Sequence, residues 1–204
     1  MDQWPVFQHR RRVVVSLSLR LARGGGDSKM QRRRVVTGQS ADGKAIIVGD
    51  ELIDPLTVTL APGAEFFPMW GADTPLRLPQ NGARPATTAW FPPPGGFRFT
   101  VLIIPPDSQV APPADMQSAL GEAAAKLPGM LEAVDAEHPH MHGTNTIDFV
   151  AILSGRLWLE VDDGTEIELR KGDSLIQNGT RHAWHNRASE PCEMIAATIG
   201  VRRA

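Results

Sequence analysis

The sequence predicts an all-β protein with one short helical segment. Segments rich in β-branched and aromatic residues recur at intervals of roughly eight to twelve residues, which is the spacing of short antiparallel strands. Nineteen glycines and seventeen prolines among 204 residues supply many turns between them. Asp-Gly and Asn-Gly pairs lie between several of these segments, as expected for hairpins. Together these features favour a β-sandwich or a small barrel.

Composition narrows the class of protein. With 42% hydrophobic and 22% charged residues, the chain can bury one core, so a single domain is expected. A net charge of -2 offers no large basic surface, which excludes nucleic acid as an expected partner. No segment approaches the eighteen or so continuous apolar residues of a membrane span. The single cysteine, Cys192, cannot form an internal disulfide, and we expect a cytoplasmic protein.

The first 29 residues differ from the rest of the chain. They hold six basic residues against two acidic ones and end near a Gly24–Gly26 run. The apolar stretch 13–19 lies between arginines and is short for a secretory signal, so no export signal is predicted. Two interpretations remain, an organellar transit peptide and a disordered or mis-started leader before Met30, and we favour the second.

The segment from 30 to 104 is expected to be mainly strands. Asp42-Gly43 is turn chemistry and predicts a hairpin between its flanking apolar runs. The expected strands cover residues 34–37, 44–48, 56–60, 65–70 and 97–104.

A long proline-rich connection, residues 71–96, separates the last two of these strands. It contains prolines at six positions and the aromatic pair Trp90 and Phe91. Connections of this length are usually functional or mobile. A lid over a site and a polyproline-like loop wrapped on the core are equally compatible with the sequence.

One helix interrupts the β pattern. Asp115 is a suitable N-cap for a helix over 116–126, where apolar residues recur at helical spacing, and Pro128-Gly129 ends it. A second helical turn is expected within 130–136. This helical segment leads directly into a cluster of histidines, either at the mouth of a site or as structural cover.

The C-terminal third is expected to be a meander of antiparallel strands. Asp162-Asp163-Gly164 predicts a hairpin, and Asn178-Gly179 predicts another tight turn. The expected strands cover residues 147–153, 156–161, 166–169, 174–177, 182–184 and 192–199.

Five of the six histidines lie between residues 138 and 185, on two segments that the meander brings together. Because side chains alternate along a strand, His142, Thr144, Thr146 and Asp148 are expected to share one face. His182 and Trp184 share a face of the later strand, and His185 points away. Two imidazoles and a carboxylate meeting in a barrel would form a metal site suited to Fe and also to Mn, Zn or Ni. The alternative is a pair of hydrogen-bonded histidines without a metal.

The other candidate residues surround this set. Thr144 and Thr146 could hydrogen-bond a substrate or a metal-bound water, and Trp184 could form the floor of the pocket or pack in the core. His138 and His140 are candidate extra ligands, but Pro139 breaks the strand between them, so either could be an exposed loop residue. Cys192 is expected to be a small buried hydrophobe.

With these residues in view, the sequence resembles the cupin superfamily. Its first motif has His-x-His, three or four residues, Glu, six residues and Gly; its second ends in Pro-x-Gly, two residues, His, three residues and Asn. Asp148 occupies the Glu position because six residues separate it from Gly155, while His142 and Thr144 occupy the two His positions. In the second motif the matching positions are Gln177 for Pro, Gly179 for Gly, His182 and Asn186.

The resemblance implies a double-stranded β-helix, a jelly-roll-like barrel, with an N-terminal β extension. It divides the chain into the leader 1–29, strands, proline-rich loop and short helices over 30–137, and cupin core motifs over 138–204. The implied metal ligands are His142, Asp148 and His182, with Gln177 among the substrate-binding residues. The chain departs from the family pattern at Thr144, which has no imidazole, and at Asp148, which is shorter than Glu.

The implied function is that of a metal-dependent enzyme acting on a small polar organic molecule such as a carbonyl, carboxylate or phenolic compound. The resemblance does not choose among dioxygenase, decarboxylase, isomerase and dehydratase chemistry. The alternative is a non-catalytic barrel that binds a similar ligand as a sensor or carrier, and a purely structural module comes third. A homodimer is the expected assembly.

Overall fold

The structure is a computed structural model that describes residues 30–203, so the predicted leader 1–29 lies outside the described residues. Its strands are β1 Arg32–Gln39, β2 Ala45–Ile53, β3 Glu65–Ala72, β4 Phe97–Ile104, β5 Thr146–Ser154, β6 Arg156–Glu160, β7 Glu166–Arg170, β8 Ser174–Gln177, β9 Ala183–His185 and β10 Cys192–Gly200. The α-helix is α1, Met116–Lys126, and short 3-10 turns cover Asp107–Gln109, Leu131–Ala133 and Asp162–Gly164.

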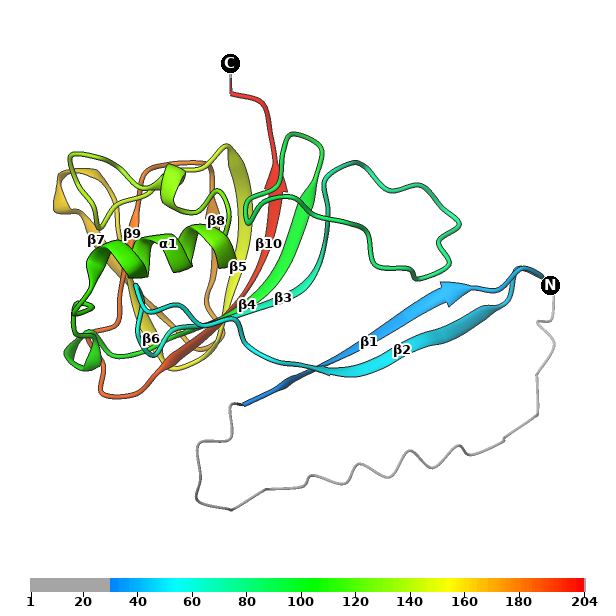
Figure 1. Cartoon of the computed structure of the whole chain (residues 1–204), viewed down its shortest axis with the longest axis horizontal. Helices are drawn as coiled ribbons and strands as arrows, with labels where there is room; N and C mark the ends of the chain where they lie inside the picture. Colours follow the sequence, from blue (N-terminus) through cyan, green and yellow to red (C-terminus); the bar gives the residue numbers. More distant parts are fainter. Residues whose placement is uncertain (1–29, 204) are drawn as a thin grey trace, which may run out of the picture.

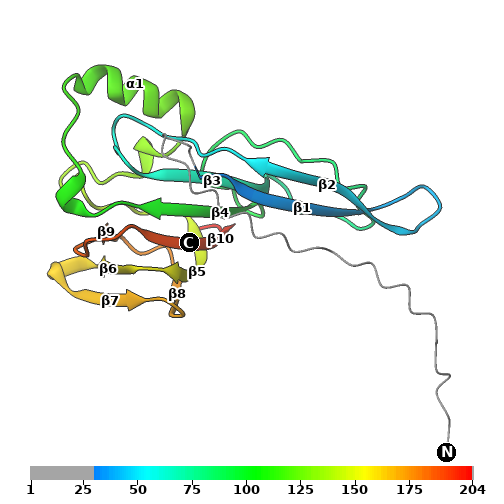
Figure 2. The same cartoon turned by 90° about the horizontal axis from the view of Figure 1, so that it is seen from below.

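Two antiparallel sheets face each other and form the barrel. One has five strands in the order β3-β4-β10-β5-β8, and the other has three in the order β7-β6-β9. Figure 2 shows the strands one below another, from β3 and β4 through β10 to β6 and β7, with α1 on the side of β3 and β7 on the opposite side. The five-stranded sheet combines strands from the two predicted parts of the chain, 30–137 and 138–204, because β4 and β5 both pair with β10. The fold is all-β, as the sequence predicted.

The core between the sheets is built by the inward half of each strand. Leu157 and Leu159 of β6 face Met194 and Ala196 of β10, and all four are buried. Cys192 is fully buried among them, as expected for a small hydrophobe, and burial raises the pKa of its thiol to about 11. The alternation of inward and outward side chains along β10 is what lets one strand serve both the core and the outer face.

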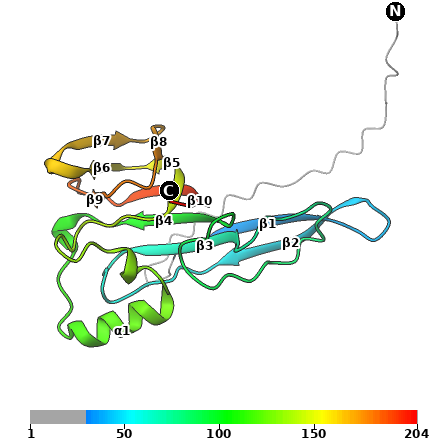
Figure 3. The same ribbon diagram turned by 90° about the horizontal axis from the view of Figure 1, so that it is seen from above.

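The predicted hairpin at the start of the chain is present as β1 and β2, joined across Asp42-Gly43. Figures 1 and 3 show that it projects beyond the two sheets rather than joining either of them. Its base is attached to the outer face of the five-stranded sheet, where Ile53 packs on Phe67 and Val101 and Arg32 pairs with Glu193.

Helix α1 has the predicted bounds, and the Asp115 side chain accepts a hydrogen bond from the Ser118 N–H at 3.0 Å. Its buried residues Ala119 and Ala123 face the barrel, and Ala123 packs in a cluster with Phe66 and Leu127. The predicted strand over 56–60 was wrong: this segment makes a single bridge, Leu56 to Phe66, and a turn follows. Within residues 30–203 no helix has the length or the continuous apolar surface needed to cross a bilayer.

Candidate functional site

A cavity of about 280 Å³ lies between the two sheets. Its lining comes from five strands of the large sheet, from β9, from the segment 130–142 and from the proline-rich connection. Most of the lining is apolar. The polar groups gather on one part of the wall, where His142, Asp148, Gln177 and His182 lie beside Trp184.

His142 and His182 are held together by their own backbones. Each residue's N–H donates to the other's carbonyl oxygen at 2.9 Å, which forms an isolated antiparallel bridge just outside β5 and β9. The two imidazole rings are consequently stacked at an angle, with their centroids 4.2 Å apart. The two histidines therefore lie side by side although neither belongs to a named strand.

The tautomer of His182 is set by its neighbour Thr180. The Nδ1 atom lies 2.9 Å from the Thr180 carbonyl oxygen, which can only accept, so Nδ1 carries the proton. The side chain is 3% exposed, and burial lowers the pKa of His182. A neutral ring protonated at Nδ1 has a lone pair at Nε2, which is available to a ligand or a reacting proton.

Burial also changes the pKa of the other two groups. It lowers the pKa of His142 to about 4, and the neighbouring His182 adds to that shift. Burial raises the pKa of Asp148. The hydroxyls of Thr146 and Thr198 favour its charged form and lower the pKa by a smaller amount. The Oδ1 atom of Asp148 is buried and has no hydrogen-bond partner among the described residues. An orphaned buried acceptor of this kind usually marks a functional group.

Six of the predicted site residues therefore line one cavity: His140, His142, Asp148, Gln177, His182 and Trp184. Thr144 and Thr146 do not line it. They lie at a second hollow of about 850 Å³, where their hydroxyls are 2.6 Å apart. Within β5, Thr146 and Asp148 keep the expected two-residue period, whereas the segment 143–145 precedes the strand, so alternation does not extend to Thr144.

The two earlier histidines have different surroundings. His140 lies at the rim of the cavity, with Nε2 4.0 Å from Glu160 Oε1. His138 is half exposed in the loop, where its backbone N–H donates to Asp135. Its role as an extra ligand stays a prediction.

The predicted metal set does not converge. In residues 30–203 the set of three His, Cys, Asp or Glu ligand atoms that all lie within 4.8 Å of one another is Glu160, Glu166 and His185, and His142, Asp148 and His182 form no such set. Ligand atoms that share one ion at 2.0 to 2.2 Å lie no more than about 4.4 Å apart. The donor types suit a divalent metal, but their placement does not fit one ion.

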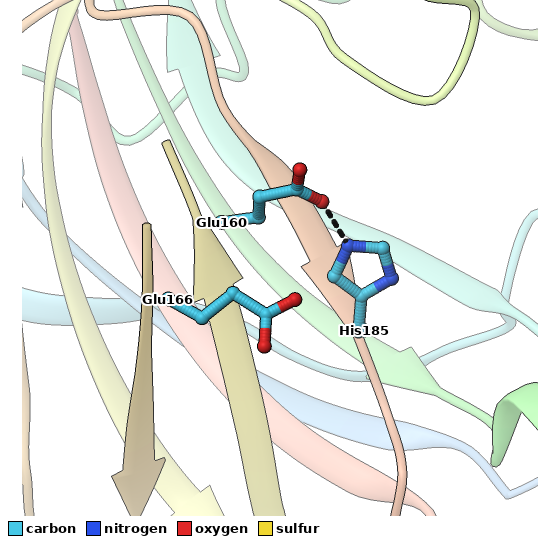
Figure 4. Close-up of side chains that lie close together, drawn as sticks. All are labelled: Glu160, Glu166 and His185. Carbon is cyan, nitrogen blue, oxygen red and sulfur yellow. Dashed lines mark hydrogen bonds and ion pairs between the residues drawn. The ribbon is translucent and has the colours of Figure 1, made fainter. Parts of the chain in front are cut away.

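The set that does converge lies outside the cavity, on the outer face of the small sheet (Figure 4). Glu160 and Glu166 are direct cross-strand partners on β6 and β7, and His185 Nε2 lies 2.6 Å from Glu160 Oε2. The two oxygens of Glu166 accept hydrogen bonds from the Arg187 guanidinium. These contacts neutralise a carboxylate pair that would otherwise repel. The sequence did not reveal this cluster, because it depends on the register of β6 and β7.

The proline-rich connection, for which a lid and a loop wrapped on the core were both compatible with the sequence, forms one wall of the cavity. Trp90 and Phe91 line the cavity, and Trp90 packs edge-on against Phe66 with ring centroids 5.6 Å apart. The buried Arg98 holds this wall in place, since its guanidinium donates to the Ala89 carbonyl oxygen and pairs with Asp73. The connection is therefore a fixed part of the cavity lining, and the aromatic pair within it was the available signal.

Residues 130–198, which contain all of these cavity histidines, match the family described as Cupin domain. This stretch, about a third of the chain, is similar to the cupin family. The match begins before β5 and ends within β10, while the barrel of the structure also takes in β3 and β4. The predicted meander over β5 to β10 was wrong: β5 pairs with β10 and β8, and β6 pairs with β7 and β9, because the chain crosses between the two sheets.

Relatives of known name match a short stretch. "Oryzines biosynthesis cluster protein J" of Aspergillus oryzae is 42% identical over 48 residues, which is 24% of this chain and 27% of the relative. "Phomopsin biosynthesis cluster protein D" of Diaporthe leptostromiformis is likewise 42% identical over 48 residues, 24% of this chain and 25% of the relative. The match thus spans about a quarter of the length of these relatives.

Solved cupin structures are similar at low identity. The Cnp3 cupin domain of Schizosaccharomyces pombe has a TM-score of 0.43 and 11% identity, over 84% of this chain and 89% of that one. A cupin 2 conserved barrel domain protein from Salinispora arenicola has a TM-score of 0.36 and 19% identity, over 72% and 87%.

Proposed function

We propose that this cupin barrel binds a small organic molecule in its cavity and acts on it by proton transfer, with His142 and His182 as the reacting groups. The observation that carries the proposal is the pair of neutral imidazoles, 4.2 Å apart, on the wall of a largely apolar cavity. Imidazole is the side chain most often used for general acid–base catalysis, and it needs a lone pair facing the reacting proton.

Each residue of the polar wall has a part in this proposal. His182 presents its Nε2 lone pair as the base, since Thr180 holds the proton on Nδ1. His142, next to it, receives or returns a proton. Asp148 lies on the same cavity wall, and its negative charge favours a protonated imidazole during the reaction. Trp90, Phe91 and Trp184 hold the apolar part of the molecule and keep water away.

Metal dependence was expected from the sequence, with Fe, Mn, Zn or Ni at His142, Asp148 and His182. The donor types support it and the distances between them do not, so no step is assigned to a metal here. The names of two relatives refer to biosynthesis clusters, which agrees with a small organic molecule as the substrate. A homodimer and a cytoplasmic location stay predictions; light scattering of the full chain tests the first.

The test compares the full chain with single variants in a small-molecule extract of the organism that carries it. Mass spectrometry follows which molecules are consumed. We expect consumption by the wild type, a loss of more than about a hundredfold in His142→Ala and His182→Ala, and normal consumption in His185→Ala, whose ring faces away from the cavity. A molecule that is retained and never converted would favour the sensor or carrier. Activity lost on chelation and restored by one divalent ion would reinstate the metal enzyme.

A further inference from the structure

The polar wall of the cavity presents hydrogen-bond acceptors from Asp148 and His182. Asp148 Oδ1 is buried and lacks a donor among the described residues. His182 presents the lone pair of Nε2, because its only ring proton is used on Thr180. Two acceptors without donors on the wall of one cavity cost free energy unless a bound molecule supplies the hydrogens.

The cavity lining also contains no cationic side chain. Neither lysine nor arginine lines it. Its polar members are two threonines, one glutamine, three histidines, two tryptophans and the carboxylate of Asp148. An anionic ligand would therefore lie in a largely apolar space beside a carboxylate and without a counter-charge. Burying an unpaired charge is far more costly than burying a neutral hydroxyl group that is hydrogen-bonded.

The remaining lining sets the shape of the ligand. Phe66, Trp90, Phe91 and Trp184 present aromatic surface, and Leu102 and Met130 add aliphatic surface. A space of about 280 Å³ with such walls suits a fused or substituted aromatic ring system.

We propose that the cavity selects molecules with an aromatic body and a hydrogen-bond-donating head group, a hydroxyl or an ammonium, and rejects carboxylates of the same shape. An ammonium head group has hydrogens for both Asp148 Oδ1 and His182 Nε2, whereas a hydroxyl donates its single hydrogen to one of the two acceptors. In both cases the ring lies against the aromatic wall. This inference rests on the proposed function for the location of the ligand, and it narrows the carbonyl, carboxylate and phenolic classes to the donors. Hydroxyl and ammonium heads share the chemistry and are separated by experiment.

The experiment measures the binding of four probes of similar size to the full chain at pH 7 by isothermal titration. They are 2-naphthol, 2-(aminomethyl)naphthalene, 2-naphthoate and naphthalene, which carry a neutral donor, a cationic donor, an anion and no head group. We expect one of the two donors to bind at least about tenfold more tightly than both naphthoate and naphthalene. The stronger of the two donors identifies the head group.

Asp148→Asn removes the charge with little change in shape. We expect it to improve the binding of 2-naphthoate and to reduce the preference for the donors over 2-naphthoate to less than about threefold. The matched control is Asp50→Asn, the same change on the projecting hairpin, which should leave all four affinities as in the wild type. Equal or tighter binding of 2-naphthoate by the wild type, or an unchanged preference in Asp148→Asn, would overturn the inference.

These outcomes are distinct from failure of the proposed function. If naphthalene and the donors bind and 2-naphthoate is preferred, the cavity is a ligand site and only the head-group inference is wrong. If none of the probes binds, the cavity is not a ligand site of this size, and both proposals fall.

Discussion

His142 and His182 exchange two backbone hydrogen bonds of 2.9 Å, and this bridge alone brings their imidazole rings to 4.2 Å from each other. The two residues come from different motifs, 40 positions apart in the chain, and neither belongs to a regular strand of the barrel. Because the contact is made by the main chain, a change of one ring leaves the other in place. Variants of either histidine therefore test chemistry more directly than folding.

The buried histidines should make the fold less stable in acid. The pKa of His142 is lowered from 6.5 to about 4, so the unfolded chain binds the proton first as the pH falls. The free energy of unfolding should decrease by about 2 to 3 kcal/mol between pH 6.5 and pH 4, with His182 acting in the same direction. Urea unfolding at a series of pH values measures this. His142→Gln should flatten the dependence, and a wild type that is equally stable at both pH values would contradict it.

Asp148→Asn should stabilise the protein while it impairs the site. The raised pKa means that the folded state favours the protonated carboxyl group and disfavours the charged one. The stability that the protonated group provides is lost as the pH rises through that pKa. Removing the charge should raise the free energy of unfolding at pH 7 by about 1 kcal/mol, or the melting temperature by about 2 to 4 °C. Calorimetry of the variant beside the wild type decides it, and a destabilised variant would mean that Oδ1 has a partner in solution.

Arg98→Met should release the aromatic wall of the cavity. It removes the hydrogen bonds to the Ala89 carbonyl and leaves Asp73 without its cationic partner, at a cost of about 3 kcal/mol in stability. Binding of 2-naphthol should weaken as well, because Trp90 loses its support. Arg33→Met is the matched control: Arg33 pairs with Asp50 where both side chains are more than half exposed, so the change should cost less than about 1 kcal/mol. Equal effects of the two substitutions would refute this role for Arg98.

Two glycines should respond in opposite ways to alanine. A Cβ at Gly200 would lie 2.0 Å from the Pro93 carbonyl oxygen, so Gly200→Ala should cost at least about 2 kcal/mol. A Cβ at Gly121, in the middle of α1, meets nothing within 4 Å, so Gly121→Ala should gain about 0.5 to 1 kcal/mol through helix propensity. Thermal unfolding of both variants checks the pair, and destabilisation by Gly121→Ala would show that α1 is held differently.

Local signals predicted the elements whose ends depend on nearby residues. The bounds of α1 follow from the Asp115 cap and the Pro128-Gly129 stop, and β4 has the predicted bounds because prolines close it. The segment 56–60 has strand-like residues but no partner beyond one bridge at Leu56, so propensity did not suffice there. The faces of His182, Trp184 and His185 followed from alternation because β9 is regular.

The sequence by itself determined the all-β class, the histidine cluster and the positions of most strands, since these depend on periodicity, turn residues and motif spacing over a few residues. Only the tertiary structure decided that Thr144 and Thr146 turn to another hollow, that Trp90 and Phe91 wall the cavity, and that Glu160 meets Glu166 and His185. The physical reason is that strand register and the path of a long loop are settled by packing between distant segments. No short stretch of sequence carries that information.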